Sequence, residues 1–443
     1  MVPGTYRHRV GAVPGRSGVL RVAKVRRGGH AYYLEVAGNG AGTGIEAPGV
    51  WLGTGAPALG LRGEVDGDAL GAVLAGDDPV TSRRLGRFHD RVTVAGFDLS
   101  FCAPKSVSML HALGPTEVVD DVRAAHVAAV DAALDYVERR AVAVRRPALG
   151  RLVPVEARAV ASAGFVHRVS RALDPHLHSH VVMANLGRGP EGRFSALDGR
   201  GVYAHSPAAG ALYHAQLRHE LTSRLGVAWE PLRHGRADVA GIGPETRRAF
   251  SQRAAAIAEH LSARGLGGAT ARTIAGHATR PGRDTNLSAD DLRPSWRVRA
   301  RAMGLGPADF GAVLDQVPRR PGPGPDPALG ERVVEELARR GRSAARRDVV
   351  RVWCGALGEG APAAAVEEVA DRLLESLPMT AAHAGQAERC GVGERRHVVG
   401  GPELTPGRGE LQRLLAARGM QMAVGPDRVV GRGRGEDLGF GLG

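Results

Sequence analysis

Two short apolar segments joined by a loop constrain the fold more than any other feature of this chain. Residues 164–169 and 178–185 have the length and the apolar composition of β-strands. The loop between them contains Asp174 and Pro175, a pair that favours a turn. The sequence therefore predicts two strands connected by a short loop.

Three histidines lie on these two predicted strands. Side chains two residues apart on a strand project from the same face, so His178 and His180 can present their imidazoles to one point. If the strand that contains His167 pairs alongside, a third imidazole joins them. Three neutral imidazoles suit Zn, Mn, Fe, Co or Ni and leave coordination positions open for catalysis. Alternating histidines also occur by chance, and this chain has others, such as His176 and His205.

The composition favours a polyanionic partner without establishing one. A length of 443 residues suggests two or three domains, and the formal net charge is +13. Such a charge favours nucleic acid or a membrane surface as the partner. Only Lys24 and Lys105 are lysines, so the excess of Arg also fits the codon bias of a GC-rich genome.

The sequence predicts a soluble, cytoplasmic protein. Its three cysteines are far apart and form no CxxC pair, as expected in a reducing compartment. No apolar run is long enough to cross a bilayer, and the first residues lack the pattern of a signal peptide. We expect a disordered extension, a main folded domain, a Pro/Gly-rich linker, and a small helical unit with a frayed tail, at residues 1–18, 19–303, 304–328 and 329–443.

Three longer strings, at residues 165–182, 96–108 and 59–66, make the histidine pattern more specific. The first resembles the metal motif of the TrwC/TraI-type (MobF) conjugative relaxases of the HUH endonuclease superfamily, with Ser179 in place of the usual Thr of His-Thr-His. The second is similar to the family's Asp-Leu-Thr-Phe-Ser-Ala-Pro-Lys-Ser-Val-Ser block, with Cys102 where Ser is usual. The third resembles its Leu-Gly-Leu-x-Gly-x-Val-Asp string. The strings occur in the family's order, and the resemblance covers about residues 19–300.

The resemblance implies an α+β fold, the HUH-type palm. Such a palm has a central antiparallel sheet flanked by helices, with the histidine strand at its centre. Residues 19–303 would then be the relaxase domain, followed by a small, mainly helical C-terminal tail.

The resemblance also implies a tyrosine nucleophile. Tyr32 and Tyr33 lie where the family carries the tyrosine that attacks phosphorus, which leaves a 5′-phosphotyrosyl protein and a free 3′-OH. We favour Tyr32 as the nucleophile. Tyr33 stays a close second, since the sequence does not decide between adjacent residues. Asp98 matches the family's acidic residue, which supports a metal histidine and the removal of the tyrosine's proton.

The metal site implied by the resemblance holds a divalent cation, Mg, Mn or Zn, on His167, His178 and His180. The cation would polarise the scissile phosphate. Lys105, at the start of a predicted helix, is expected to contact a DNA phosphate, and Arg171 is expected to face the DNA backbone.

The chain departs from the family in two respects. Many members have a second tyrosine pair, whereas residues 36–44 contain no tyrosine, so one tyrosine region is expected to act. Members usually continue into a helicase, but a Walker A loop, GxxxxGK[ST], cannot occur here because neither lysine follows a glycine. The expected partners are single-stranded DNA at an origin-of-transfer nick site, a separate helicase, and coupling or secretion proteins.

Three other functions stay open at this point. A rolling-circle replication initiator or single-strand transposase has the same chemistry, but typically carries its tyrosine after the histidine pair, whereas Tyr32 precedes it. A non-catalytic DNA-binding remnant would keep the fold and the metal. A metal-dependent phosphoesterase would hydrolyse DNA with a metal-bound water and without a covalent step.

Overall fold

The computed structural model describes residues 20–37, 46–86, 93–148, 150–158, 160–282, 287–319, 327–340, 343–375 and 396–398. The expected extension at 1–18, and the expected tail after 375 apart from residues 396–398, lie outside these ranges. Within the described ranges, no helix combines the length and the hydropathy needed to span a membrane.

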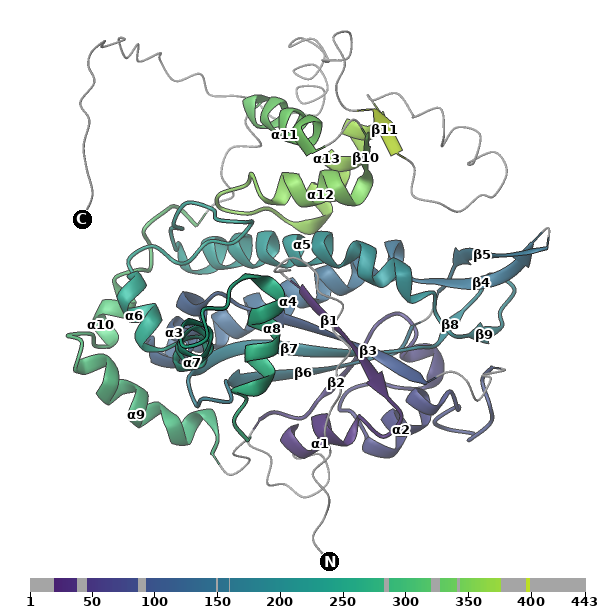
Figure 1. The fold of residues 1–443 in the computed structure, drawn as a ribbon, viewed down its shortest axis with the longest axis horizontal. Coiled ribbons are helices and arrows are strands. Elements are labelled where there is room, and N and C mark those ends of the chain that lie inside the picture. Colours follow the sequence, from purple (N-terminus) through teal and green to yellow (C-terminus); the bar gives the residue numbers. More distant parts are fainter. Residues whose placement is uncertain are drawn as a thin grey trace, which may run out of the picture.

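An antiparallel sheet of five strands forms the centre of the fold (Figure 1). Its strands are β1 (Leu20–Arg26), β2 (Val50–Leu52), β3 (Val94–Cys102), β6 (Ser162–Val169) and β7 (Pro175–Ala184). Their order across the sheet is β1-β3-β7-β6-β2. The expected α+β class is confirmed, and the strand with the paired histidines occupies the central position as predicted.

One face of the sheet packs against long helices. Residues alternate along β3, so the buried side chains of Phe97, Leu99 and Phe101 face these helices while Asp98 and Ser100 lie on the opposite face. These helices are α4 (Thr116–Arg140) and α5 (Gly199–Leu225), together with α3 (Lys105–Leu113), which follows the end of β3. This alternation separates a dry hydrophobic core from the face that carries polar side chains.

Short helices cover part of the other face, so helices flank the sheet as predicted. These elements are α1 (Ala31–Ala37), the 3-10 helix η1 (Pro57–Leu59) and α2 (Gly67–Ala75). They shield the apolar side chains of Phe165 and Val182, which would otherwise be exposed. Helix α2 begins where the Asp66 carboxylate accepts the Ala69 backbone N–H at 2.8 Å, and it ends at Gly76 with φ +86°.

Smaller elements surround this core. They are β4 (Ala143–Ala148), β5 (Arg151–Glu156), β8 (Gly187–Arg188), β9 (Phe194–Ser195), α6 (Pro244–Ala249), α7 (Gln252–Ser262), α8 (Gly268–Ala278), α9 (Ala289–Arg301) and α10 (Pro307–Gly311). Helix α10 lies within the segment expected to be a linker, 304–328. Phe310 and Val313 of this segment are buried, and the backbone N–H of Asp315 donates to the Leu225 carbonyl at 2.9 Å. The described part of the segment is therefore packed against the domain.

The C-terminal helices dock on α5 (Figure 1). They and their short strands are α11 (Pro327–Arg340), β10 (Ser343–Ala345), α12 (Arg346–Cys354), α13 (Ala363–Glu375) and β11 (Arg396–Val398). The side chains of Val333 and Trp353 belong to the same hydrophobic core as the buried side chains of α5. The guanidinium of Arg218 in α5 is buried and donates to the carbonyls of Cys354 and Leu357, both at 3.0 Å.

Candidate active site

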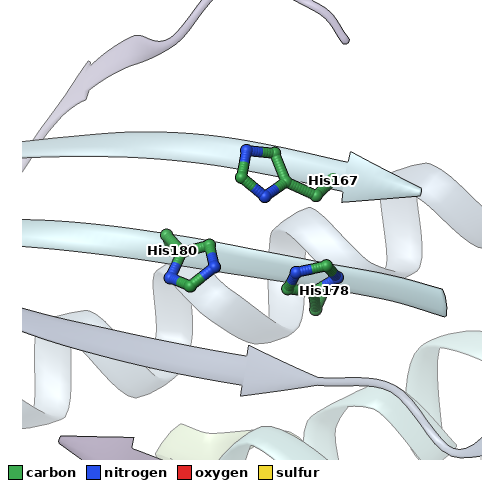
Figure 2. A group of neighbouring side chains, drawn as sticks. All are labelled: His167, His178 and His180. Atoms are coloured by element: carbon green, nitrogen blue, oxygen red, sulfur yellow. The ribbon is translucent and has the colours of Figure 1, made fainter. Parts of the chain in front are cut away.

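Three histidine side chains converge on the sheet face opposite α4 and α5, as Figure 2 shows. His167 on β6 is the antiparallel partner of His178 on β7, and His180 follows two positions later on β7. One ring nitrogen of each histidine lies within 4.8 Å of the other two. The structure thus brings together the three ligands expected from the sequence, because antiparallel pairing aligns them on one face.

Hydrogen bonds orient two of these imidazoles for metal binding. Nδ1 of His178 lies 2.8 Å from the carbonyl oxygen of His176, and Nδ1 of His180 lies 2.9 Å from both carboxylate oxygens of Asp98. Both acceptors require a proton on Nδ1, which leaves the Nε2 lone pair for a cation. Burial lowers the pKa of His178 well below its usual value, so this ring is neutral at pH 7. This donor set fits a divalent cation that binds imidazole nitrogen.

Asp98 connects the histidines to the tyrosine helix. Its carboxylate is buried and accepts hydrogen bonds from the Tyr33 hydroxyl at 2.9 Å and from the Ser100 hydroxyl at 3.3 Å, besides the one from His180. Burial raises the pKa of Asp98, but His180 and these hydrogen bonds outweigh it and hold the pKa below its usual value. The residue is therefore a carboxylate that fixes the orientation of the His180 imidazole.

His178 and His180 open into a cleft of about 1660 Å³, while His167 lies buried behind them. Ten lysine and arginine side chains line this cleft, against two carboxylates, Asp174 and Glu336. Tyr32, Arg171 and His180 all contribute to its wall. The volume exceeds the range of about 300–1,000 Å³ for small-molecule sites, and the charge suits an extended anion.

The two adjacent tyrosines have different environments, because consecutive residues of α1 point in directions about 100° apart. Tyr33 is 6% exposed, stacks on Phe165 with ring centroids 5.6 Å apart, and is absent from the cleft wall. Burial, and then the Asp98 charge, raise the pKa of Tyr33 well above its usual value. Tyr32 lines the cleft, and Nη2 of Arg171 donates to its hydroxyl at 3.2 Å.

Lys105 and the turn before β7 form a second group on the cleft wall. The Lys105 ammonium donates to the Pro175 carbonyl at 2.6 Å, and burial lowers the pKa of this lysine to about 8. The neighbouring Asp174 is 1% exposed and accepts hydrogen bonds from Gln252 and from Arg299. The turn that precedes the histidine strand is therefore held by buried ionic and polar contacts.

The sequence reasoning missed other residues of the cleft. His176 stacks on His178 with ring centroids 4.4 Å apart and lines the cleft. The alternate spacing of histidines along β7 was a signal that could have identified His176. Arg253, Arg272 and Arg280, from the region of α7 and α8, also line the cleft, and no local motif distinguishes them from other arginines.

Comparisons with known proteins agree with this geometry. Residues 19–303, well over half of the chain, match the TrwC relaxase family. The multifunctional conjugation protein TraI of Escherichia coli is 36% identical over 221 residues, which cover 47% of this chain. TraI of Escherichia coli K12 is 35% identical over 221 residues. Each match covers 12% of TraI, so the chain corresponds to a small part of these relatives.

Solved structures with a similar fold include DNA complexes. The metal-bound structure of the conjugative relaxase TrwC with oriT DNA has a TM-score of 0.58 and is 28% identical, and the match covers 65% of this chain and 99% of the solved TrwC chain. The copper-bound TrwC complex has a TM-score of 0.57 and is 30% identical, with the same coverage of both chains. The family match, the fold and the histidine site agree, and the chain belongs to the TrwC relaxase family.

Proposed function

We propose that this protein is a DNA relaxase that nicks single-stranded DNA and transfers the strand to a tyrosine. One observation carries the proposal: Tyr32, His178 and His180 line one basic cleft, and the buried Asp98 and His167 lie directly behind them, Asp98 bonded to His180 and His167 beside both histidines. The TrwC structures with oriT DNA support a DNA substrate. The E. coli relative is a conjugation protein, which supports a role in initiating conjugative transfer at an origin-of-transfer nick site.

Tyr32 is the better placed nucleophile. Its phenol would lose its proton to solvent and its oxygen would attack the phosphorus, while the bond from phosphorus to the 3′ oxygen breaks. The products are a 5′-phosphotyrosyl protein and a 3′-OH, whose oxygen takes a proton from solvent. Tyr32 lines the cleft where DNA would enter, whereas Tyr33 is buried and bonded to Asp98. The Arg171 guanidinium at the Tyr32 oxygen is positioned to stabilise negative charge that develops there.

Tyr33 and Asp98 have a positioning role in this proposal. Asp98 holds the His180 ring with Nε2 directed away from the carboxylate, and Tyr33 ties helix α1 to the same carboxylate. Tyr32 is the neighbouring residue on α1, so this contact also sets where the Tyr32 side chain meets the cleft.

The cofactor in this proposal is a divalent cation on His167, His178 and His180. Such a cation would supply Lewis-acid polarisation of the scissile phosphate. Three imidazole nitrogens favour Zn, Mn, Co or Ni over Mg, which prefers oxygen ligands. The expected partners beyond DNA, a separate helicase and coupling or secretion proteins, belong to this proposal as well.

A covalent-adduct assay tests the proposal. The purified protein is incubated with Mn²⁺ and single-stranded DNA from around its own gene, and a protein–DNA band that survives denaturation is sought. We expect a band with wild type and with Tyr33→Phe, and none with Tyr32→Phe or His178→Ala.

The other outcomes identify the alternatives. A band lost only with Tyr33→Phe would move the nucleophile to Tyr33. Cleavage without a band, unaffected by either tyrosine variant, would indicate a phosphoesterase that uses a metal-bound water. Binding without cleavage, over the whole flanking region and several metals, would indicate a non-catalytic DNA-binding protein.

A further inference from the structure

Besides Arg253, Arg272 and Arg280, the cleft at the histidine site has a second basic wall, which comes from the C-terminal helices. Arg332, Arg339 and Arg340 of α11 and Arg351 of α12 line the same cleft as His178 and His180, and all four are exposed. These helices lie after residue 303, where the match to the TrwC relaxase family ends. The wall is therefore a feature of this chain beyond the matched domain.

The C-terminal wall is fixed in place by buried contacts. Val333 and Leu337 of α11 are buried in the core that includes α5. Arg218, only 1% exposed, donates to the carbonyl of Cys354, the last residue of α12, and to that of Leu357 just beyond it. The Ala363 backbone N–H donates to the Gln216 side chain at 2.7 Å. The arginines thus stand on a surface that is packed against the relaxase domain.

The chemistry of this wall suits phosphates and not bases. Glu336 is the one carboxylate that α11 and α12 contribute to the cleft among the described residues, and it pairs with Arg339 and Arg340. The other lining residues from these two helices are arginine or valine, with no aromatic ring for a base to stack on. Exposed arginines bind the phosphates of a nucleic-acid backbone, and phosphate contacts carry no sequence information.

We propose that α11 and α12 form a phosphate-binding wall that holds the single-stranded DNA beyond the histidine site, irrespective of its base sequence. The identity of the strand rests on the function proposed above. Beyond that function, the C-terminal helices take a direct part in DNA binding.

The test measures DNA affinity by fluorescence anisotropy over a range of salt concentrations, in EDTA so that no metal-dependent cleavage occurs. Two oligonucleotides of equal length and unrelated sequence serve as probes. The triple variant Arg332→Ala, Arg339→Ala, Arg351→Ala should lower the slope of log K against log [salt] by about 2, at about 0.7 per lost phosphate contact. The loss should be equal for both probes.

Two further variants make the result specific. The triple Arg→Lys variant keeps the charges and should retain the wild-type slope, which a purely structural role would not predict. Arg123→Ala is the matched control: Arg123 is exposed on α4, pairs with Asp120 three residues away as Arg339 pairs with Glu336, and lies outside the cleft wall. It should bind DNA as wild type does.

An unchanged slope in the triple Ala variant would overturn this proposal, as would a loss confined to one oligonucleotide. Failure of the proposed function gives a different result. In that case wild type binds both probes in EDTA and forms no covalent adduct when Mn²⁺ is supplied.

Discussion

The hydroxyl of Tyr33 donates a hydrogen bond of 2.9 Å to Oδ2 of Asp98, and the same carboxylate accepts Nδ1–H of His180. These residues are far apart in the sequence, yet one carboxylate joins the helix that carries the tyrosines to the strand that carries the histidines. The position of Tyr32 relative to the three histidines therefore depends on a buried contact made by its neighbour.

Replacing Asp98 by Asn should weaken metal binding and adduct formation. The amide can orient its NH₂ toward His180, which removes the charged acceptor that fixes the Nδ1–H tautomer. A loss of about 10- to 100-fold in metal affinity is typical for such a partner. Isothermal titration with Zn²⁺ measures the affinity. Ser100→Ala removes a longer hydrogen bond to the same carboxylate and a 3.3 Å contact with Nδ1 of His180, but it keeps the charged acceptor and should have a smaller effect; equal effects would contradict this role for Asp98.

The two tyrosines should differ in their effect on stability. Tyr33→Phe leaves the buried Asp98 carboxylate with one partner fewer, so we expect the free energy of unfolding to fall by about 1–3 kcal/mol. Tyr32→Phe removes a hydroxyl at the cleft wall and should change the free energy of unfolding by less than about 0.5 kcal/mol. Urea unfolding of both variants measures the difference, and a larger loss for Tyr32→Phe would contradict the assignment of their environments.

A divalent cation should stabilise the folded protein through the three histidines. At a free metal concentration of 100 times Kd, the expected gain is about 2.7 kcal/mol. Thermal unfolding with and without Zn²⁺ or Mn²⁺ measures the shift in Tm, which EDTA should reverse. His178→Ala should lose the shift, whereas His234→Ala, at an exposed histidine outside the triad, should retain it.

Acid should destabilise the metal-free protein because buried histidines resist protonation. Burial lowers the pKa of His126 to about 3 and that of His111 to about 4, from an ordinary value of 6.5. The unfolded chain takes up these protons at a higher pH than the folded protein does. The full free energy of unfolding is therefore present above pH 6.5, and it falls as the pH drops from there toward the lowered pKa values. Each residue contributes a slope of about 1.4 kcal/mol per pH unit.

Urea unfolding between pH 7 and pH 4 tests this slope. His126→Gln removes one of the titrating groups, so the free energy of unfolding of this variant should fall less steeply with pH than that of wild type. The difference in slope should correspond to the uptake of about one proton. If the two slopes are the same, protonation of His126 does not contribute to acid unfolding.

The sequence determined the strands of the site and the family. The alternation in residues 178–185 and the His167 segment predicted which face of each strand carries the imidazoles, because side-chain direction along a strand has a period of two. The strings at 59–66, 96–108 and 165–182 predicted the family, and the comparisons confirm it.

Tertiary structure alone decided how the neighbouring tyrosines differ. Their sequence context is nearly the same, but packing of α1 buries Tyr33 against Phe165 and leaves Tyr32 at the cleft beside Arg171. Packing likewise placed the arginines of α11 and α12 at the cleft of a domain that ends before them in the sequence. Local periodicity fixes only where a side chain points within its own strand or helix. Contacts between residues about 65, 140 or 300 positions apart depend on how those elements pack, and packing is set by the buried surface of the whole fold.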